Sequence, residues 1–312
     1  MLDPALADGT QIDLQSLISL RQEAARLDLS SRDKVLATRS GGHLSHFRGR
    51  GVEFDESRVY QRGDDPRNMD WRVMARTGKP YVKLFREERE RPVWLLVDMG
   101  SSMRFGTRVA FKSVVAAKAA ALLAWAASDN GDRVGGLVFD ESRQFEQRPM
   151  ARTAGLLPLL KALSEPPTPG QQGRHSSLAS AANRLAQQVR SGSLVFLLSD
   201  FAGLSMSDDN WLARLARNSE VVLVRVYDPL ETEAPEAGQY PISDGEHYSV
   251  LDTSRGDLQR HWNSLFAERT ELLGKLVQRH GIHQFELRTD KPVGPSLYQG
   301  LLPRRRIRRG VL

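Results

Sequence analysis

The sequence predicts an α/β protein with an open, doubly wound and mostly parallel sheet, preceded by an N-terminal helical and β extension. Short uninterrupted apolar runs, such as VWLLVD at residues 93–98 and SLVFLLSD at 193–200, are typical of strands that helices cover on both faces. Helical segments separate these runs. Alternation of this kind implies right-handed crossovers and an open sheet.

The chain opens with a predicted helix. Leucine, isoleucine and alanine recur at helical spacing over residues 14–27, after a candidate N-cap at Asp13. A second helix start is predicted at residues 30–33, and the glycine-rich stretch at 39–51 is a predicted connection.

Residues 51–91 are dense in charge. We expect a short helix opening at Pro66 and a strand at residues 81–86. Acidic and basic side chains alternate around this turn, which favours a structural ion-pair network. Its members would be Asp64, Asp65 and Asp70 with Arg58, Arg62 and Arg67.

The remaining elements follow the same alternation. Further strands are expected at 132–139, 220–227 and 284–287, with an antiparallel edge strand at 144–149 and a short strand at 248–252. The helices are expected at 107–128, 154–163, 177–190, 211–218 and 256–280. Trp94 and Trp125 fall on apolar elements and are predicted to be core residues.

Bulk composition is that of a folded protein. Hydrophobic residues make up 40% and charged residues 26% of 312 positions, which argues against extensive disorder. The absence of cysteine excludes disulfides, thiolate zinc sites and thiol nucleophiles. Without a long apolar stretch or a signal-peptide pattern, we expect a cytoplasmic chain with no membrane span. The expected domains are 1–90, 91–290 and a basic tail at 291–312.

The positive charge is concentrated in that tail. The formal net charge is +6, and five arginines lie at 304–306 and 308–309, so the rest of the chain carries +6 − 5 = +1. An arginine run of this kind can bind nucleic acid, although it is more often a solvated end.

Two carboxylates stand where ligands bind in such sheets. Asp98 and Asp200 each close a predicted strand, and ligands of open α/β sheets bind beyond the carboxyl ends of the strands. Ser102 follows Asp98 in a predicted tight turn. Carboxylates and hydroxyls suit a hard divalent cation. The alternative is that both aspartates only cap helices.

The motif DMGSSM, with Ser176 in GRHSSL and Asp200 in LLSDF, resembles the metal-ion-dependent adhesion site of von Willebrand factor A domains. That resemblance implies a von Willebrand factor A-like, Rossmann-like domain. It also implies that Mg²⁺ or Mn²⁺ is held by Asp98, Ser102, Ser176 and Asp200. The usual pattern is Asp-x-Ser-x-Ser, then Thr, then Asp. Because Gly100 replaces a ligand serine, weak or absent metal binding is expected.

A second motif precedes the sheet. The stretch RVYQRGDDPRNMDWRVMART, followed by a strand and VWLLVDMGSSMRFG, resembles the family known as domain of unknown function 58, over about residues 42–287. The signature positions are Arg58, Tyr60, Gly63, Asp64, Asp65, Arg67, Asp70, Trp71, Ala75 and Arg76. The resemblance implies an adaptor or chaperone-like module that works with a MoxR-type AAA+ ATPase.

Enzymatic motifs are missing. Ser101 and Ser102 lack a G-x-S-x-G elbow, and neither GxxxxGK[ST] nor GxGxxG occurs, so we expect a non-enzymatic protein. Two alternatives stay open: a protein-interaction module that needs no metal, and nucleic-acid binding through the arginine-rich tail.

Overall fold

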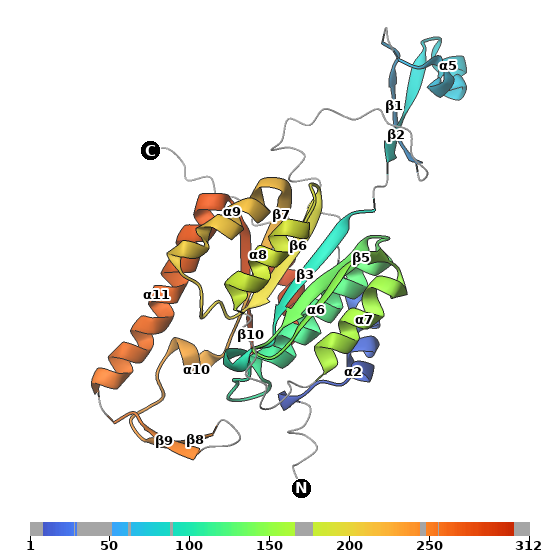
Figure 1. Ribbon diagram of the computed structural model, residues 1–312. Coiled ribbons are helices and arrows are strands. Elements are labelled where there is room, and N and C mark those ends of the chain that lie inside the picture. Colours follow the sequence, from blue (N-terminus) through green and yellow to red (C-terminus); the bar gives the residue numbers. More distant parts are fainter. Residues whose placement is uncertain are drawn as a thin grey trace, which may run out of the picture. The chain divides into compact units, whose positions relative to one another are not determined.

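The computed structural model describes residues 9–27, 29, 52–61, 64–87, 90–165, 177–243, 248–254 and 256–302 (Figure 1). The predictions for residues 30–33 and 39–51, for Arg62, for Ser176 and for the arginine run at 304–309 lie outside these ranges. The chain divides into two compact units, one of residues 1–34 and 91–312 and one of residues 35–90.

A six-stranded sheet forms the centre of the larger unit, in the order β10-β7-β6-β3-β4-β5. All neighbouring pairs are parallel except β4 with β5, which confirms the predicted antiparallel edge strand. The strands are β3 (Pro92–Asp98), β4 (Arg133–Phe139), β5 (Gln144–Ala151), β6 (Ser193–Ser199), β7 (Ser219–Tyr227) and β10 (His283–Arg288).

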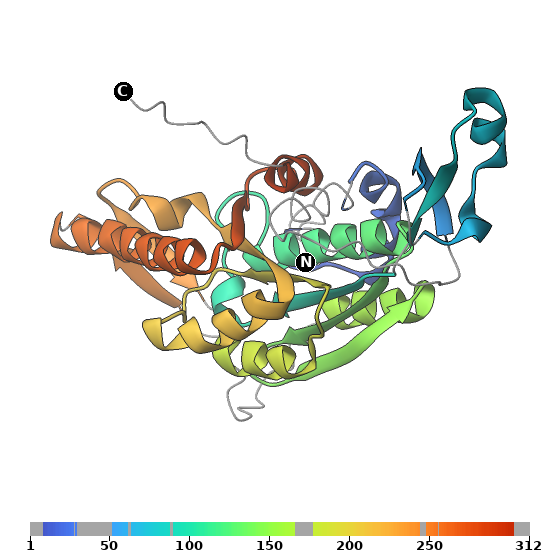
Figure 2. The same ribbon diagram turned by 90° about the horizontal axis from the view of Figure 1, so that it is seen from above.

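Helices cover both faces of this sheet (Figure 2), so the predicted doubly wound, mostly parallel architecture is confirmed. Successive side chains of a strand point to opposite faces. Val93, Leu95 and Val97 therefore join one core, and Trp94 and Leu96 join the other.

The first core is completed by α2 (Leu14–Ser19), α3 (Arg21–Ala24), α6 (Lys112–Asp129), α7 (Thr153–Ser164) and α12 (Val293–Leu301). The second is completed by α8 (Leu178–Gln188), α9 (Asp209–Asn218) and α11 (Gly256–His280). Trp94 and Trp125 are both buried, as predicted.

The alanine-rich helix α6 is buried over almost its whole length, because small side chains let it lie close to the sheet on one side and to its neighbouring helices on the other. It begins at Lys112 rather than at residue 107. A long-range contact explains the later start of the helix. The backbone N–H and the hydroxyl of Thr107 both donate to Asp228, at 3.0 and 2.6 Å.

The predicted helix at 14–27 is wrong in one respect, because it is divided into α2 and α3 at Leu20. The indole N–H of Trp125 donates to the Leu17 carbonyl oxygen at 3.1 Å. In a continuous helix that oxygen would accept from residue 21, so a tertiary contact competes with the helical hydrogen bond.

Several short elements were not predicted. They are η2 (Ser101–Met103), η3 (Met206–Asp208), α10 (Pro229–Thr232) and strand β8 (Gln239–Ser243), which pairs with the predicted β9 (Tyr248–Asp252). Helix α12 lies in the stretch expected to be a tail, and its Leu297 is fully buried. No helix within the described ranges is long and apolar enough to span a membrane.

The smaller unit contains an antiparallel hairpin of β1 (Val52–Val59) and β2 (Tyr81–Glu87), with η1 (Pro66–Asn68) and α5 (Trp71–Thr77) in its connection. The predicted strand at 81–86 and the helical turn at Pro66 are confirmed; β1 was not predicted. Arg58 pairs with both oxygens of Asp64, at 2.7 and 2.9 Å. Asp70 instead caps α5 and accepts from Ser57 at 2.8 Å.

Candidate functional site

The candidate site lies where the chain order of the sheet reverses. After β3 the chain adds β4 and β5 on one side, then crosses to place β6 on the other side of β3. The carboxyl ends of β3 and β6 therefore form a topological switch point, which is the usual ligand position in open α/β sheets. Asp98 is the last residue of β3, and Asp200 directly follows β6.

A pocket of about 330 Å³ opens at this point. Its lining combines carboxylates with hydroxyls. The polar members are Asp98, Ser102, Glu141, Ser177, Ser199, Asp200, Ser205, Ser207 and Asp208.

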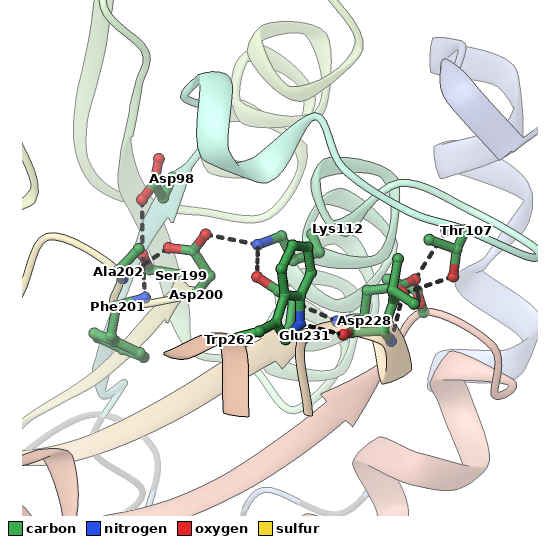
Figure 3. A network of polar contacts seen from close by, with 12 residues as sticks. Asp98, Thr107, Lys112, Ser199, Asp200, Phe201, Ala202, Asp228, Glu231 and Trp262 are labelled. Atoms are coloured by element: carbon green, nitrogen blue, oxygen red, sulfur yellow. Dashed lines mark hydrogen bonds and ion pairs between the residues drawn. The ribbon is translucent and has the colours of Figure 1, made fainter. Parts of the chain in front are cut away.

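Asp98 is buried without a counter-charge. Its side chain accepts from the Gly100 N–H at 2.9 Å and from the Ser199 hydroxyl at 2.7 Å (Figure 3). Within the described part of the chain, no cationic side chain pairs with it. Burial raises the pKa of Asp98 to about 6, although the two hydrogen bonds by themselves lower it. The negative charges of Asp200 and Glu141 add to the rise.

Asp200 is equally buried but is paired. The Lys112 ammonium donates to Asp200 at 2.7 Å and to Glu231 at 2.8 Å, and Lys112 is itself only 1% exposed. Burial alone would raise the pKa of Asp200. The Lys112 charge and hydrogen bond outweigh burial, with help from the Ala202 N–H and the Ser102 hydroxyl, so the pKa lies below its ordinary value.

The turn that follows β6 carries Asp200 and contains one strained residue, Phe201. Phe201 has φ of 55°, in the left-handed region that a bulky residue rarely adopts. Its side chain is buried, and its N–H donates to the Ser199 hydroxyl at 3.0 Å. Packing and this hydrogen bond together keep the strained turn in place at the pocket, where such strain is commonly found.

Lys112 also links the pocket to α10 (Figure 3). Glu231 and Asp228 form the capping box of α10, and Asp228 also accepts from Thr107 and Thr289. Trp262 of α11 donates to the Leu230 carbonyl oxygen at 2.8 Å. A continuous set of polar contacts therefore runs from β6 through Lys112 to α10 and α11.

Glu141 approaches the position where the adhesion pattern has a serine. It follows β4, and its carboxylate accepts from the Ser101 N–H at 2.5 Å. A Cβ at position 100 would lie 3.1 Å from an Asp98 oxygen and 3.2 Å from a Glu141 oxygen. The space beside Gly100 therefore already holds two carboxylates.

Three of the four predicted ligands, Asp98, Ser102 and Asp200, line the same pocket. Ser176 lies outside the described residues. Its neighbour Ser177 lines the pocket and caps α8 by accepting from the Ser180 N–H. Sequence reasoning missed Lys112 and Glu141. Lys112 and Lys118 are the two lysines of the alanine-rich helix α6, and the sequence does not show that Lys112 is the buried one. No sequence pattern indicates the role of Glu141.

The donor set fits a hard divalent cation. The carboxylates of Asp98 and Glu141 and the Ser102 hydroxyl line the pocket and would supply oxygen ligands. Burial, which raises the pKa of Asp98, also favours a positive charge beside this carboxylate. Within the described ranges, no three acidic or histidine side chains group closely enough to hold a metal by themselves. A cation here would therefore depend on hydroxyl and water ligands as well.

Two solved structures align weakly: conserved hypothetical protein BatB from Bacteroides thetaiotaomicron, and an aerotolerance-related membrane protein from Bacteroides fragilis. The TM-scores are 0.41 and 0.39, with 15% and 16% identity. Each alignment covers 67% of this chain, and 96% and 97% of those chains.

Relatives at the sequence level are more similar. Uncharacterized proteins Mb1516 of Mycobacterium bovis and Rv1480 of Mycobacterium tuberculosis are each 31% identical over 320 residues, covering 97% of this chain and 94% of each relative. A family model described as protein of unknown function DUF58 matches residues 56–271. The chain therefore belongs to the DUF58 family.

Proposed function

We propose that this protein is a non-enzymatic, protein-binding adaptor or chaperone-like module that works with a MoxR-type AAA+ ATPase, and that the pocket at Asp98 is its contact site. The observation that carries the proposal is the buried Asp98 carboxylate, which lines an open pocket and has no described cationic partner. A buried charge of this kind is costly to the fold. A ligand that supplies positive charge would remove that cost.

A divalent cation supplies such charge. Mg²⁺ or Mn²⁺ held by Asp98 and Ser102, with Glu141 beside them, would leave a position for an acidic side chain of the partner. This residue set deepens the adhesion-type interpretation of the sequence, since Glu141 adds a carboxylate where Gly100 lacks a hydroxyl.

The pocket chemistry favours binding over catalysis. Ser102 hydrogen-bonds Asp200, whose pKa is held low, so this carboxylate is a weak base for activating a hydroxyl. Of the described residues that line the pocket, none is histidine. Ser102 therefore has no strong base beside it that would activate its hydroxyl.

A contact without metal is the second candidate, and two observations favour it. Lys112 already neutralises Asp200, and Gly100 removes one hydroxyl ligand. In this version a cationic side chain of the partner reaches Asp98 directly.

Binding of a purified MoxR-type ATPase tests both versions. Affinity is measured in Mg²⁺ and in excess chelator for the wild type, for Asp98→Asn and for the control Asp129→Asn. Asp129 lies at the far end of α6 and pairs with Arg21 at the surface. We expect Asp98→Asn to lose binding and Asp129→Asn to keep it.

The measurement in excess chelator distinguishes the cation-bridged contact from the direct contact. Binding that needs Mg²⁺ supports the cation-bridged contact, and binding that persists in chelator but needs Asp98 supports the direct contact. Equal affinity of the wild type and Asp98→Asn would overturn the proposal.

A further inference from the structure

A second pocket, of about 430 Å³, opens at the amino ends of the parallel strands, at the other end of the sheet from the pocket at Asp98. It is lined by the first residues of β3 and β4, the second half of β5 and the end of α8. Arg133 begins β4 and Phe139, in the first pocket, ends it. At about 3.3 Å per residue, the two pockets are about 20 Å apart along the strand.

This pocket is basic. Arg133, Arg148 and Arg190 line it, and none of the described lining residues is acidic. All three arginines are exposed, so a ligand can reach them. Within the described ranges, the side chains of Arg148 and Arg190 make no ion pair or hydrogen bond. Three guanidinium groups around one hollow favour an anion with more than one oxygen, because each can donate two parallel hydrogen bonds.

Gln188 lines the pocket and carries an unsatisfied acceptor. The side-chain amide N–H of Gln188 donates to Glu146, and Glu146 also pairs with Arg184. The reversed amide would place two oxygens against each other, so this hydrogen bond fixes its orientation. The buried Gln188 Oε1 has no hydrogen-bond partner in the described structure. Buried acceptors are normally satisfied, so this atom favours a ligand that carries an N–H or O–H donor.

The volume of the pocket and the residues that line it restrict the class of ligand further. The volume lies in the range of small-molecule sites and exceeds the needs of a lone inorganic anion. Trp94, Pro92, Pro149 and Val189 provide apolar wall beside the charged groups.

We propose that this pocket binds a small organic phosphate. The arginines hold the phosphate group, and Gln188 Oε1 accepts a hydrogen bond from the organic part. Recognition by side-chain guanidinium groups needs no glycine-rich phosphate loop, which the sequence lacks. This site is independent of Asp98 and of the proposed partner contact.

Calorimetric titration of the full chain tests the proposal, with inorganic phosphate, ribose 5-phosphate and AMP as probes at physiological ionic strength. The variants are Arg148→Gln/Arg190→Gln, the single Arg190→Gln, and Gln188→Leu. Arg217→Gln is the matched control, because Arg217 is an exposed arginine near the end of α9 that lines neither pocket. Thermal unfolding of each variant verifies the fold.

We expect at least one organic phosphate to bind more tightly than inorganic phosphate. Its affinity should fall about tenfold or more in the double arginine variant and stay unchanged in Arg217→Gln. Gln188→Leu should weaken the organic probe several-fold and leave inorganic phosphate unaffected.

Three outcomes would overturn the proposal. No probe binds the wild type at about millimolar concentration; the arginine variants bind as tightly as wild type; or inorganic phosphate binds as tightly as both organic probes, which would indicate an adventitious ion only.

Discussion

Asp98 and Asp200 occupy equivalent places at the ends of neighbouring parallel strands, yet they differ in their electrostatics. Their exposed fractions are 8% and 7%, so burial does not distinguish them. The pKa of Asp98 is raised to about 6, whereas that of Asp200 is lowered. The difference is the Lys112 ammonium, which contacts Asp200, whereas Asp98 has no cationic partner among the described residues.

This contrast separates a structural carboxylate from one available to a ligand. Asp200 is part of the polar contacts that connect β6 with α10, and it contributes to the fold. Asp98 lowers the stability of the fold when it is ionised, which is a common property of residues kept for binding. Under the proposed function, Asp200 supports the fold and Asp98 contacts the ligand.

Removing Lys112 would leave the buried Asp200 carboxylate without a counter-charge, as Asp98 is. We expect this substitution to change the free energy of unfolding more than any other discussed below. Lys112→Met leaves Asp200 and Glu231 without their buried partner, so the free energy of unfolding should fall by about 3–5 kcal/mol. Urea denaturation measures the change. Lys112→Met/Asp200→Asn should recover part of the loss, whereas a loss under about 1 kcal/mol for Lys112→Met would mean that the pair acts like a surface ion pair.

Removing the charge of Asp98 should stabilise the protein. A raised pKa means that the folded state keeps a proton that the unfolded chain releases, so the wild type loses stability as pH rises from about 4 to about 6. At about 1.4 kcal/mol per pKa unit, Asp98→Asn should gain up to about 3 kcal/mol above this window and nearly nothing below it.

Urea denaturation across this pH range, without divalent metal, checks the prediction for Asp98. A variant that is less stable than the wild type at neutral pH would contradict the idea that the charge of Asp98 is unpaired.

A smaller effect is expected at Gly100. Gly100→Ser places a Cβ 3.1 and 3.2 Å from the oxygens of Asp98 and Glu141, both held by hydrogen bonds, so we expect a loss of about 1 kcal/mol. Adding Glu141→Ala should relieve the crowding. If thermal unfolding shows Gly100→Ser to be as stable as the wild type, the pocket is more adaptable than these contacts indicate.

Local patterns predicted most of the central sheet. The apolar runs ending in Asp98 and Asp200 are strands buried on both faces, so their length and composition sufficed. The same reasoning placed Asp98, Ser102 and Asp200 at one edge, because parallel strands end together. The start of α6 and the break between α2 and α3 were not predictable, since Asp228 and Trp125 act from distant parts of the chain.

The electrostatic partners were also beyond local patterns. Lys112 lies 88 positions before Asp200, and Glu141 reaches Ser101 over 40 positions. No sequence pattern predicts contacts between residues that are this far apart in the chain. Strand β1 is dense in charged residues. Helix α12 contains a proline and two glycines, which disfavour a helical prediction.

The most direct measurement is calorimetric titration of Mg²⁺ and Mn²⁺ into the wild type, with Asp98→Asn and Asp129→Asn as comparison variants. The cation-bridged contact predicts saturable binding in the wild type and Asp129→Asn and its loss in Asp98→Asn. Saturable binding that survives in Asp98→Asn, or no binding to the wild type, would contradict a cation held by Asp98.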